Sequence, residues 1–470
     1  MKKLAIIFMI FTVSFAQPKD TIALSLEEAL NMAVNTNPLL AIEKIRTDIA
    51  KTVLRERQFV YEPTIFAEYA TPSLRSDQDS LRIGIRQTAP TGTAIELSTT
   101  GSTFYSANSN PNFPATAVGR LNITQSLLQG LGPRVNLVPI RRARIDTEIS
   151  QEELSAYALR LFAEIERAYW TLMLSNKELE IYQYSLELAQ RLLFEGEQRL
   201  NAGTVAPIDL ITIRAEVASR EKQLFDAQIA TQQRSLRLAS LINAPHFFDK
   251  EIILTDTTLT LGEADGLAEH LEAAQKFRQD LRQATLLAEK GELDLIQTKN
   301  GLLPRLDFWL DLRLTSSHED FTLFPNSSDV RATGQSRMGL QLQFPITSGA
   351  ARQRHRAAKY SSQQQQLALD NFGRLIDFEI RSAHLEVSRA FRQIETAQTV
   401  SALQIQKLEA EQNKLSVGRS TGYAVLQVQR DVVAANLDEA RARISYIEAL
   451  LSLYSRDATL LQRRGVSGLR

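Results

Sequence analysis

LSAYALRLFAEIERAYWTLMLSNKELEIYQYSLELAQRLL, residues 154–193, has apolar or small side chains at alternating steps of four and three residues. This is a heptad pattern, and a heptad pattern of this length predicts a helix that packs along its whole length. The seam positions are Leu154, Ala158, Leu161, Ile165, Ala168, Leu172, Ser175, Leu179, Tyr182, Leu186, Ala189 and Leu193.

The same pattern occurs a second time in the same register, with Ile376 at the position of Leu161. The second seam consists of Ile376, Ile380, Ala383, Val387, Ala390, Ile394, Ala397, Ser401, Gln404 and Leu408. Each copy then reaches a glycine break, RLNAGT at 199–204 and KLSVGR at 414–419, and another helix follows. The sequence therefore predicts two long helical hairpins, with the second beginning near Ser348. We expect their seams to be buried against hairpins of the other repeat and of other copies of the chain.

A shorter helix pair is also duplicated. Ser25 and Glu28 form a capping-box pattern at the start of its first helix, and Asn37-Pro38 starts the next. The matching positions are Leu26, Leu30, Leu40 and Pro63 in one copy and Leu267, Leu271, Leu281 and Pro304 in the other. Two repeats of the whole architecture follow from these two duplications.

After each of those prolines the apolar period changes from helical to two. Residues 305–314 and 337–346 each alternate aliphatic with polar side chains over about ten positions, the length of a tilted strand that crosses a bilayer. The loop between them would lie at the outer surface. A soluble antiparallel sheet with one wet face produces the same alternation, so this pattern alone leaves both interpretations open.

The first repeat contains a longer insert, with strand patterns at 64–70, 81–87, 93–99 and 117–127. An even number of strands is required, because the chain must return to the side that holds the helices. Two of the four segments could span, with 81–99 as an accessory hairpin, or all four could.

The expected domain organisation follows from these patterns. Residues 1–16 read as a secretory signal, with two lysines before an apolar run and a small-residue cleavage site. The first repeat covers 17–242 with its insert at about 64–127, and residues 17–24 read as a tether. A connector at 243–266 carries a short strand, the second repeat covers 267–455 with its insert at about 305–346, and 456–470 form a short tail.

Composition excludes several classes of protein. The chain has no cysteine, which excludes disulfides and thiolate metal sites, and its 54 basic and 54 acidic residues give no surplus of positive charge for nucleic acid. The five histidines have no metal-ligand spacing, and there is no phosphate-binding glycine loop. We therefore predict no enzymatic activity, no metal site and no cofactor.

This arrangement, over residues 25–455, resembles the TolC-type outer membrane efflux family. The segments FPITSG at 344–349, followed by Arg352, and QSLLQG at 125–130 are similar to that family's strand-to-helix junctions. The resemblance implies a mainly α-helical homotrimer, with a β-barrel in the lipid of the outer membrane and an α-helical barrel in the periplasm. It implies a periplasmic adaptor and an inner-membrane transporter as partners, and twelve strands in the trimer, which makes 81–99 an accessory hairpin.

The resemblance also implies roles for the two glycine turns, which would form the periplasmic tip. The expected adaptor contacts are Gly203, Thr204, Val205, Gly418, Arg419 and Ser420. The expected gate residues are Asp209, Arg419, Ser420, Ala424 and Gln427. Ala424 and Gln427 occupy positions where other members carry acidic residues, so a strongly cation-selective ring is not expected.

For these turns and for Asp209, simpler roles also fit. The glycines serve as left-handed helix caps in either interpretation, and the Asp209 carboxylate would also stabilise the first turn of a helix through the helix dipole.

Two functional interpretations follow. The first is a passive exit duct of a tripartite efflux or type I secretion system, through which an inner-membrane pump exports its substrates. The alternative is an exported coiled-coil scaffold with a soluble β-domain, which explains the heptads and the alternation without transport.

Overall fold

The computed structural model describes residues 21–71, 78–104, 115–203, 206–256, 265–318, 322–326 and 332–465. The expected signal at 1–16 lies outside these residues. Contacts divide the chain into two compact units. Unit 1 contains the described residues up to Ala41, Tyr157–Arg278 and the described residues from Ile376 onward, and unit 2 contains Ile42–Ala156 and Gln279–Leu375.

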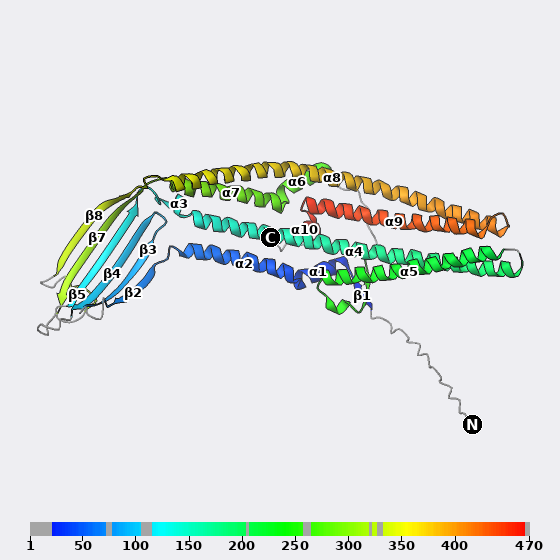
Figure 1. Ribbon diagram of the computed structural model, residues 1–470, viewed down its shortest axis with the longest axis horizontal. Helices are drawn as coiled ribbons and strands as arrows, with labels where there is room; N and C mark the ends of the chain where they lie inside the picture. The colour runs from blue at the N-terminus through cyan, green and yellow to red at the C-terminus, as the bar shows by residue number, and fades with distance from the viewer. Residues whose placement is uncertain are drawn as a thin grey trace, which may run out of the picture. The chain divides into compact units, whose positions relative to one another are not determined.

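The duplication expected from the sequence is present in the helices (Figure 1). Helices α1 and α6 have 11 residues each, and α2 and α7 have 22 residues each. Helices α5 and α9 both have 35 residues. The bounds are α1 Leu26–Thr36, α2 Pro38–Phe59, α4 Val138–Asn201, α5 Pro207–Leu241, α6 Leu267–Phe277, α7 Gln279–Asn300, α8 Gly349–Ser416 and α9 Gly422–Arg456. Three short helices are α3 Pro133–Asn136, η1 Pro245–Phe247 and α10 Leu460–Arg463.

The predicted capping box starts α1. The Ser25 hydroxyl accepts from the Glu28 backbone N–H at 3.1 Å, and the Glu28 carboxylate accepts from the Ser25 N–H at 2.8 Å. The hydrogen bonds from Ser25 hold the pKa of the Glu28 carboxyl below its ordinary value. Both donors at the helix start are therefore satisfied by side chains.

The segment before α1 is not a free tether, which corrects the expectation for its described part. Strand β1 (Thr21–Leu24) pairs in parallel with β6 (Glu251–Leu254) from the connector between the repeats. The buried Tyr169 hydroxyl of α4 lies 3.2 Å from the Leu24 carbonyl oxygen and 3.3 Å from Asp256 Oδ2. Burial raises the pKa of Tyr169 to about 12, so it remains a neutral donor.

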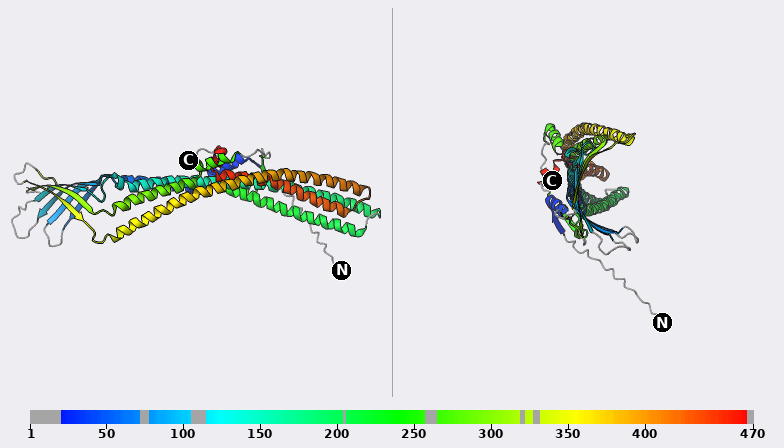
Figure 2. Two further views of the ribbon diagram at one scale, coloured as in Figure 1. Left: turned by 90° about the horizontal axis from the view of Figure 1, so that it is seen from above. Right: turned by 90° about the vertical axis from the view of Figure 1, so that its left-hand side faces the viewer.

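The two heptad helices pack within their own hairpins, α4 with α5 and α8 with α9 (Figures 1 and 2). Ser401 of the α8 seam donates to Asn436 of α9 at 2.8 Å, and Thr231 of α5 donates to the Ser175 carbonyl of α4 at 3.3 Å. At Leu408 of the second seam and Leu193 of the first, the seams also pack against the other hairpin, as the sequence predicts. Their contact with other copies of the chain stays a prediction. Buried members of the α8 seam are Ile376, Ile380, Ala383, Val387, Ala390, Ile394, Ser401 and Leu408.

Unit 2 contains a twisted sheet of six antiparallel strands in the order β2-β3-β4-β5-β7-β8 (Figures 1 and 2). The strands are β2 Thr64–Ala70, β3 Gln78–Thr88, β4 Thr93–Phe104, β5 Ala115–Ser126, β7 Arg305–His318 and β8 Thr333–Gln343. Four come from the first repeat and two from the second. Among the described residues, no helix combines the length and the apolarity needed to cross a bilayer.

The hairpin at 81–99 is not accessory. Its strands β3 and β4 lie inside the sheet, each paired with a neighbour on both sides. Gly92, with φ +87°, makes the turn between them and accepts from the Ser126 backbone N–H at 3.0 Å. A Cβ at position 92 would lie 2.3 Å from the Gly130 carbonyl oxygen, so the turn requires glycine both for its conformation and for space.

We predict that Tyr169→Phe lowers the free energy of unfolding by about 1–2 kcal/mol, because it leaves a buried Leu24 carbonyl without this donor. The change is measured as a lower thermal midpoint by circular dichroism. Tyr184→Phe is the matched control, since Tyr184 is 55% exposed. Equal midpoints for the two variants would contradict the anchoring role.

Candidate functional site

Two features of the chain hold the candidate functional residues: the ends of the long hairpins in unit 1 and the two faces of the sheet in unit 2. Among the residues that the structure describes, no group of three or more histidine, aspartate or glutamate side chains is placed to hold a metal ion.

Both hairpins end in a left-handed glycine. Gly203 has φ +70° and Gly418 has φ +74°, the conformation that ends a helix with little steric cost. After the second turn the Arg419 backbone N–H donates to the Lys414 carbonyl at 2.8 Å, and its side chain is exposed. Thr204 and Val205, two of the expected adaptor contacts, lie outside the described residues.

The expected gate residues do not meet one another within one chain. Asp209 lies exposed in the first turn of α5, and Gln427 is exposed on α9. Ser420 donates instead to Glu411 of its own hairpin. That hydrogen bond, followed by the Lys414 ammonium, lowers the pKa of the Glu411 carboxyl. Ala424 is half-buried, and its backbone N–H donates to the Thr421 hydroxyl at 3.2 Å.

Beyond the turns, the two hairpins are joined by an apolar cluster. Ile213 of α5 fits beside two glycines: a Cβ on Gly196 of α4 would lie 3.2 Å from its Cδ1, and one on Gly422 of α9 would lie 3.4 Å away. The absence of side chains at these two positions lets the helices approach closely. The cluster consists of Leu192, Ile213, Leu408, Leu415, Val425, Leu426, Val428 and Val432.

A charged cluster lies next to it and was not predicted from the sequence. Glu216 and Arg220 of α5 have side chains that are 4% and 5% exposed, and they pair at 2.8 Å. Arg430 of α9 donates from Nε to Glu216 Oε2 at 3.1 Å. Burial acts to raise the pKa of Glu216, but the hydrogen bond from Arg430 and the charges of both arginines outweigh it, so the pKa is lowered.

The only sequence signal for this cluster was a Glu-Arg pair at the spacing of one helical turn, which is common on solvated helix surfaces. The second partner of Glu216 is Arg430, which belongs to the other repeat. No local pattern connects the two.

The sheet separates charge from apolar surface. On one face Arg82 and Arg86 hydrogen-bond Glu96 across β3 and β4, and Arg120 lies 3.5 Å from Asp311 across β5 and β7. The other face carries aliphatic side chains that the described residues do not cover. Their exposed fractions are far above those of side chains in the core of a soluble protein. They include Ile65, Ile85, Ile95, Leu97, Met338, Leu340 and Leu342.

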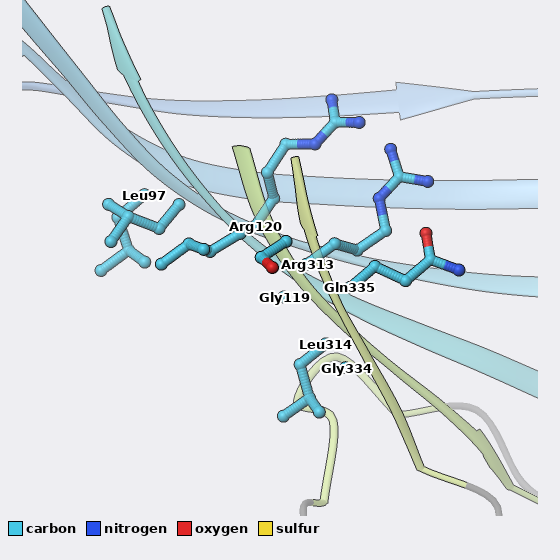
Figure 3. A pocket seen from close by; sticks show the side chains of 10 residues that line it. Leu97, Gly119, Arg120, Arg313, Leu314, Gly334 and Gln335 are labelled. Carbon is cyan, nitrogen blue, oxygen red and sulfur yellow. The ribbon is translucent and has the colours of Figure 1, made fainter. Parts of the chain in front are cut away.

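Figure 3 shows this division in the middle of the sheet. Arg120, Arg313 and Gln335, which are register partners on β5, β7 and β8, point to one side of the strands, and Leu97 and Leu314 point to the other (Figure 3). A two-faced sheet with exposed aliphatic side chains on one surface and ion pairs on the other is suited to lie between lipid and water.

A family model described as "Outer membrane efflux protein" matches residues 94–244 and 271–457. The chain belongs to the outer membrane efflux protein family. The first match covers the first repeat from β4 onward and the second covers nearly all of the second repeat, so together they include both long hairpins. The expected family, the fold class of two helical repeats with strand inserts, the transport function and the outer-membrane location are confirmed. The scaffold alternative is no longer needed, since the family is one of transport channels.

Relatives with curated names are distant. The chain is 22% identical over 352 residues to the cobalt-zinc-cadmium resistance protein CzcC of Cupriavidus metallidurans, covering 73% of this chain and 76% of that protein. It is 22% identical over 298 residues to the outer membrane protein TolC of Escherichia coli, covering 62% and 60%. The structure of VceC from Vibrio cholerae superposes with a TM-score of 0.69 at 16% identity, covering 92% and 95%. These likenesses support the fold.

We predict that Glu216→Gln lowers the thermal midpoint at neutral pH, because two arginines lose the charge that they surround. Since the pKa of Glu216 is lowered from 4.5, its contribution to stability is present above that value and is lost as pH falls through the depressed pKa. The gap between wild type and Glu216→Gln, measured by scanning calorimetry, should therefore narrow below about pH 4.5.

The exposed Glu395 provides a control, and Glu395→Gln should follow wild type at every pH. A gap that does not change with pH would show that Glu216 stabilises the hairpins by packing alone.

Proposed function

We propose that three copies of the chain form a passive exit duct, with the sheets closed into a β-barrel in the outer membrane and the hairpins closed into an α-helical barrel in the periplasm. The observation that carries the proposal is the two-faced sheet with its exposed aliphatic surface. Met338 is 74% exposed and Leu340 is 66% exposed in the single chain, values that lipid would accommodate and water would not.

In this proposal the domain roles follow the sequence. Residues 1–16 are the export signal, 17–242 and 267–455 are the repeats with inserts at about 64–127 and 305–346, and 243–266 connect them. Residues 456–470 are the tail. Transport needs no catalytic step, because an inner-membrane transporter supplies the energy and a periplasmic adaptor links it to the duct.

The adaptor would contact the hairpin ends. The assigned contacts are Gly203, Thr204, Val205, Gly418, Arg419 and Ser420. Exposed apolar side chains surround these turns: Ile208 is 65% exposed and Val417 is 70% exposed. A cluster of exposed apolar residues at a loop end is typical of a protein contact surface.

The gate would form between copies. Asp209, Arg419, Ser420, Ala424 and Gln427 are the assigned residues, and Asp209, Arg419 and Gln427 expose side chains that meet no partner among the described residues of their own chain. Their partners would therefore come from a neighbouring copy. The Glu216–Arg430 contact would keep each α5 and α9 together as the entrance opens.

The test of the duct is membrane fractionation followed by SDS gels of unheated samples. We expect a heat-dissociable trimer in the outer-membrane fraction. A monomer in the soluble periplasmic fraction would overturn the proposal.

We predict that Asp209→Ala raises single-channel conductance in planar bilayers, because it removes a carboxylate that holds the entrance closed. The control is Asp226→Ala, an exposed carboxylate farther along the same helix, which should leave conductance unchanged. Wild-type conductance in Asp209→Ala would remove Asp209 from the closing network.

A further inference from the structure

We propose that the barrel formed by this chain has eighteen strands, six from each of three copies. In this barrel, β8 of one copy pairs with β2 of the next, and Glu68 lies beside Arg337 across the seam. This inference rests on the trimeric channel proposed above. It departs from the twelve strands that the family resemblance implies.

The first argument is the length of the insert. Before the strands, the equivalent helices α2 and α7 begin at positions 38 and 279, an offset of 279 − 38 = 241. After the strands, α5 and α9 begin at positions 207 and 422, an offset of 422 − 207 = 215. The offset falls by almost the length of the β3–β4 hairpin, which runs from 78 to 104. The first repeat therefore contains one complete additional hairpin.

The second argument is that this hairpin is built like the rest of the sheet. Strands β3 and β4 have 11 and 12 residues, enough to cross a bilayer. Glu96 and Arg82 face the charged side, whereas Leu97 and Ile85, which are register partners, face the aliphatic side and are 57% and 45% exposed. A hairpin outside the barrel wall would not need a continuous lipid-facing row.

The third argument is the two open edges. Strand β2 has one neighbour, β3, and β8 has one neighbour, β7, among the described strands. Unpaired backbone groups are very costly in lipid, so both edges must be closed there. With six alternating strands per copy, β8 and the β2 of the next copy run antiparallel, and a head-to-tail contact of this kind closes into a ring.

The register of the sheet supports this closure. One row of paired residues runs through Thr64, Arg86, Glu96, Asn122, Asp311 and Arg337. It starts at the first residue of β2 and ends at Arg337, whereas β8 continues to Gln343. Suppose that Gln343 pairs with Thr64 of the next copy. The row of the next copy then starts opposite position 343 of β8, and not opposite position 337 where the first row ends. This shift along the strand, repeated at each copy, tilts the strands by roughly 35° from the barrel axis, within the range of closed barrels.

That register brings complementary charges together. Arg337 is exposed and has no ion-pair partner among the described residues. Glu68 is 61% exposed and lies 3.6 Å from Arg82, which also pairs with Glu96. Glu68 would lie opposite Gly339 of the neighbouring copy and diagonal to Arg337, a separation that long side chains reach.

The helices next to the two edges carry matching apolar stripes. On α2, which leads into β2, Ile42, Ile45 and Ile49 are exposed by 45%, 58% and 58%. On α8, which follows β8, Tyr360 and Leu367 are exposed by 56% and 62%. All five belong to unit 2. A copy seated on the β2 edge by its β8 strand would bring its α8 stripe to α2, so one neighbour covers both surfaces.

Eighteen strands make a wide lumen. With strands about 4.8 Å apart and tilted by about 35°, the barrel would be roughly 34 Å across, against roughly 23 Å for twelve strands at the same tilt.

Each copy contributes six arginines and four carboxylates to the charged face, a net charge of 6 − 4 = +2. These are Arg82, Arg86, Arg120, Arg305, Arg313 and Arg337, with Glu68, Glu96, Asp307 and Asp311.

Cysteine cross-linking tests the seam, and the chain has no native cysteine to interfere. In the proposed register Ala67 lies opposite Leu340 of the next copy, so A67C/L340C in the full chain should give covalent dimers and trimers on heated, non-reducing gels. Each single variant should not. A second double variant, A67C/M338C, tests a shifted register. If neither double variant gives these products while the unheated trimer is intact, the proposed seam is wrong and the proposed duct is unaffected. Loss of the trimer in wild type would overturn both.

Thiol labelling tests whether β4 forms part of the wall. In outer-membrane vesicles, L97C should react with a membrane-soluble maleimide and T100C, on the charged side of the same strand, with a water-soluble one. Reaction of both positions with the water-soluble reagent would place the hairpin outside the barrel and overturn the count of eighteen.

A charge exchange tests the ion pair. Glu68→Arg should lower the temperature at which the unheated-gel trimer dissociates, and adding Arg337→Glu should restore it. If the trimer of the double variant dissociates at the same temperature as that of Glu68→Arg, Glu68 and Arg337 do not pair across the seam.

Discussion

A strand in lipid cannot leave its backbone N–H and C=O groups unpaired, and the rest of this chain depends on that constraint. One copy has a six-stranded sheet with two open edges, so it can be stable in a membrane only as part of a closed ring. The number of strands per chain is even for a separate reason, since each chain must return to the side of its helices. Lipid around such a ring would cover the aliphatic side chains that are exposed in a single copy.

In the long hairpins, several kinds of contact hold the helices together. Apolar seam residues pack each helix against its partner and, at Leu408, against the other hairpin. The Ile213 contacts with Gly196 and Gly422 bring the hairpins close. The Glu216–Arg430 pair adds a directional contact between them. Apolar packing has little directional preference, whereas the hydrogen bonds from the half-exposed Arg430 to the buried Glu216 carboxylate favour one geometry of the contact between the hairpins.

Much of this could be predicted from the sequence, because heptads and alternation are local patterns that repeat many times. The α8 seam from Ile376 to Leu408 follows from periodicity alone, and so does the strand at 305–314, which the structure extends to His318. Pairings between distant segments could not be predicted. Strands β1 and β6 are too short to show a period, and Glu216 meets Arg430 only after folding. The family resemblance implies an accessory hairpin at 81–99, whereas its alternating pattern is that of the other strands and the structure places it inside the sheet.

The turn at Gly92 lies at the end of the sheet where β2 begins. A barrel shared by identical subunits can change in circumference only by whole hairpins, because a single added strand would leave the chain on the wrong side of the membrane. With three subunits the smallest increment is six strands. Pore width in such an assembly can therefore change only in steps. One step is one glycine turn with its two flanking strands in each chain.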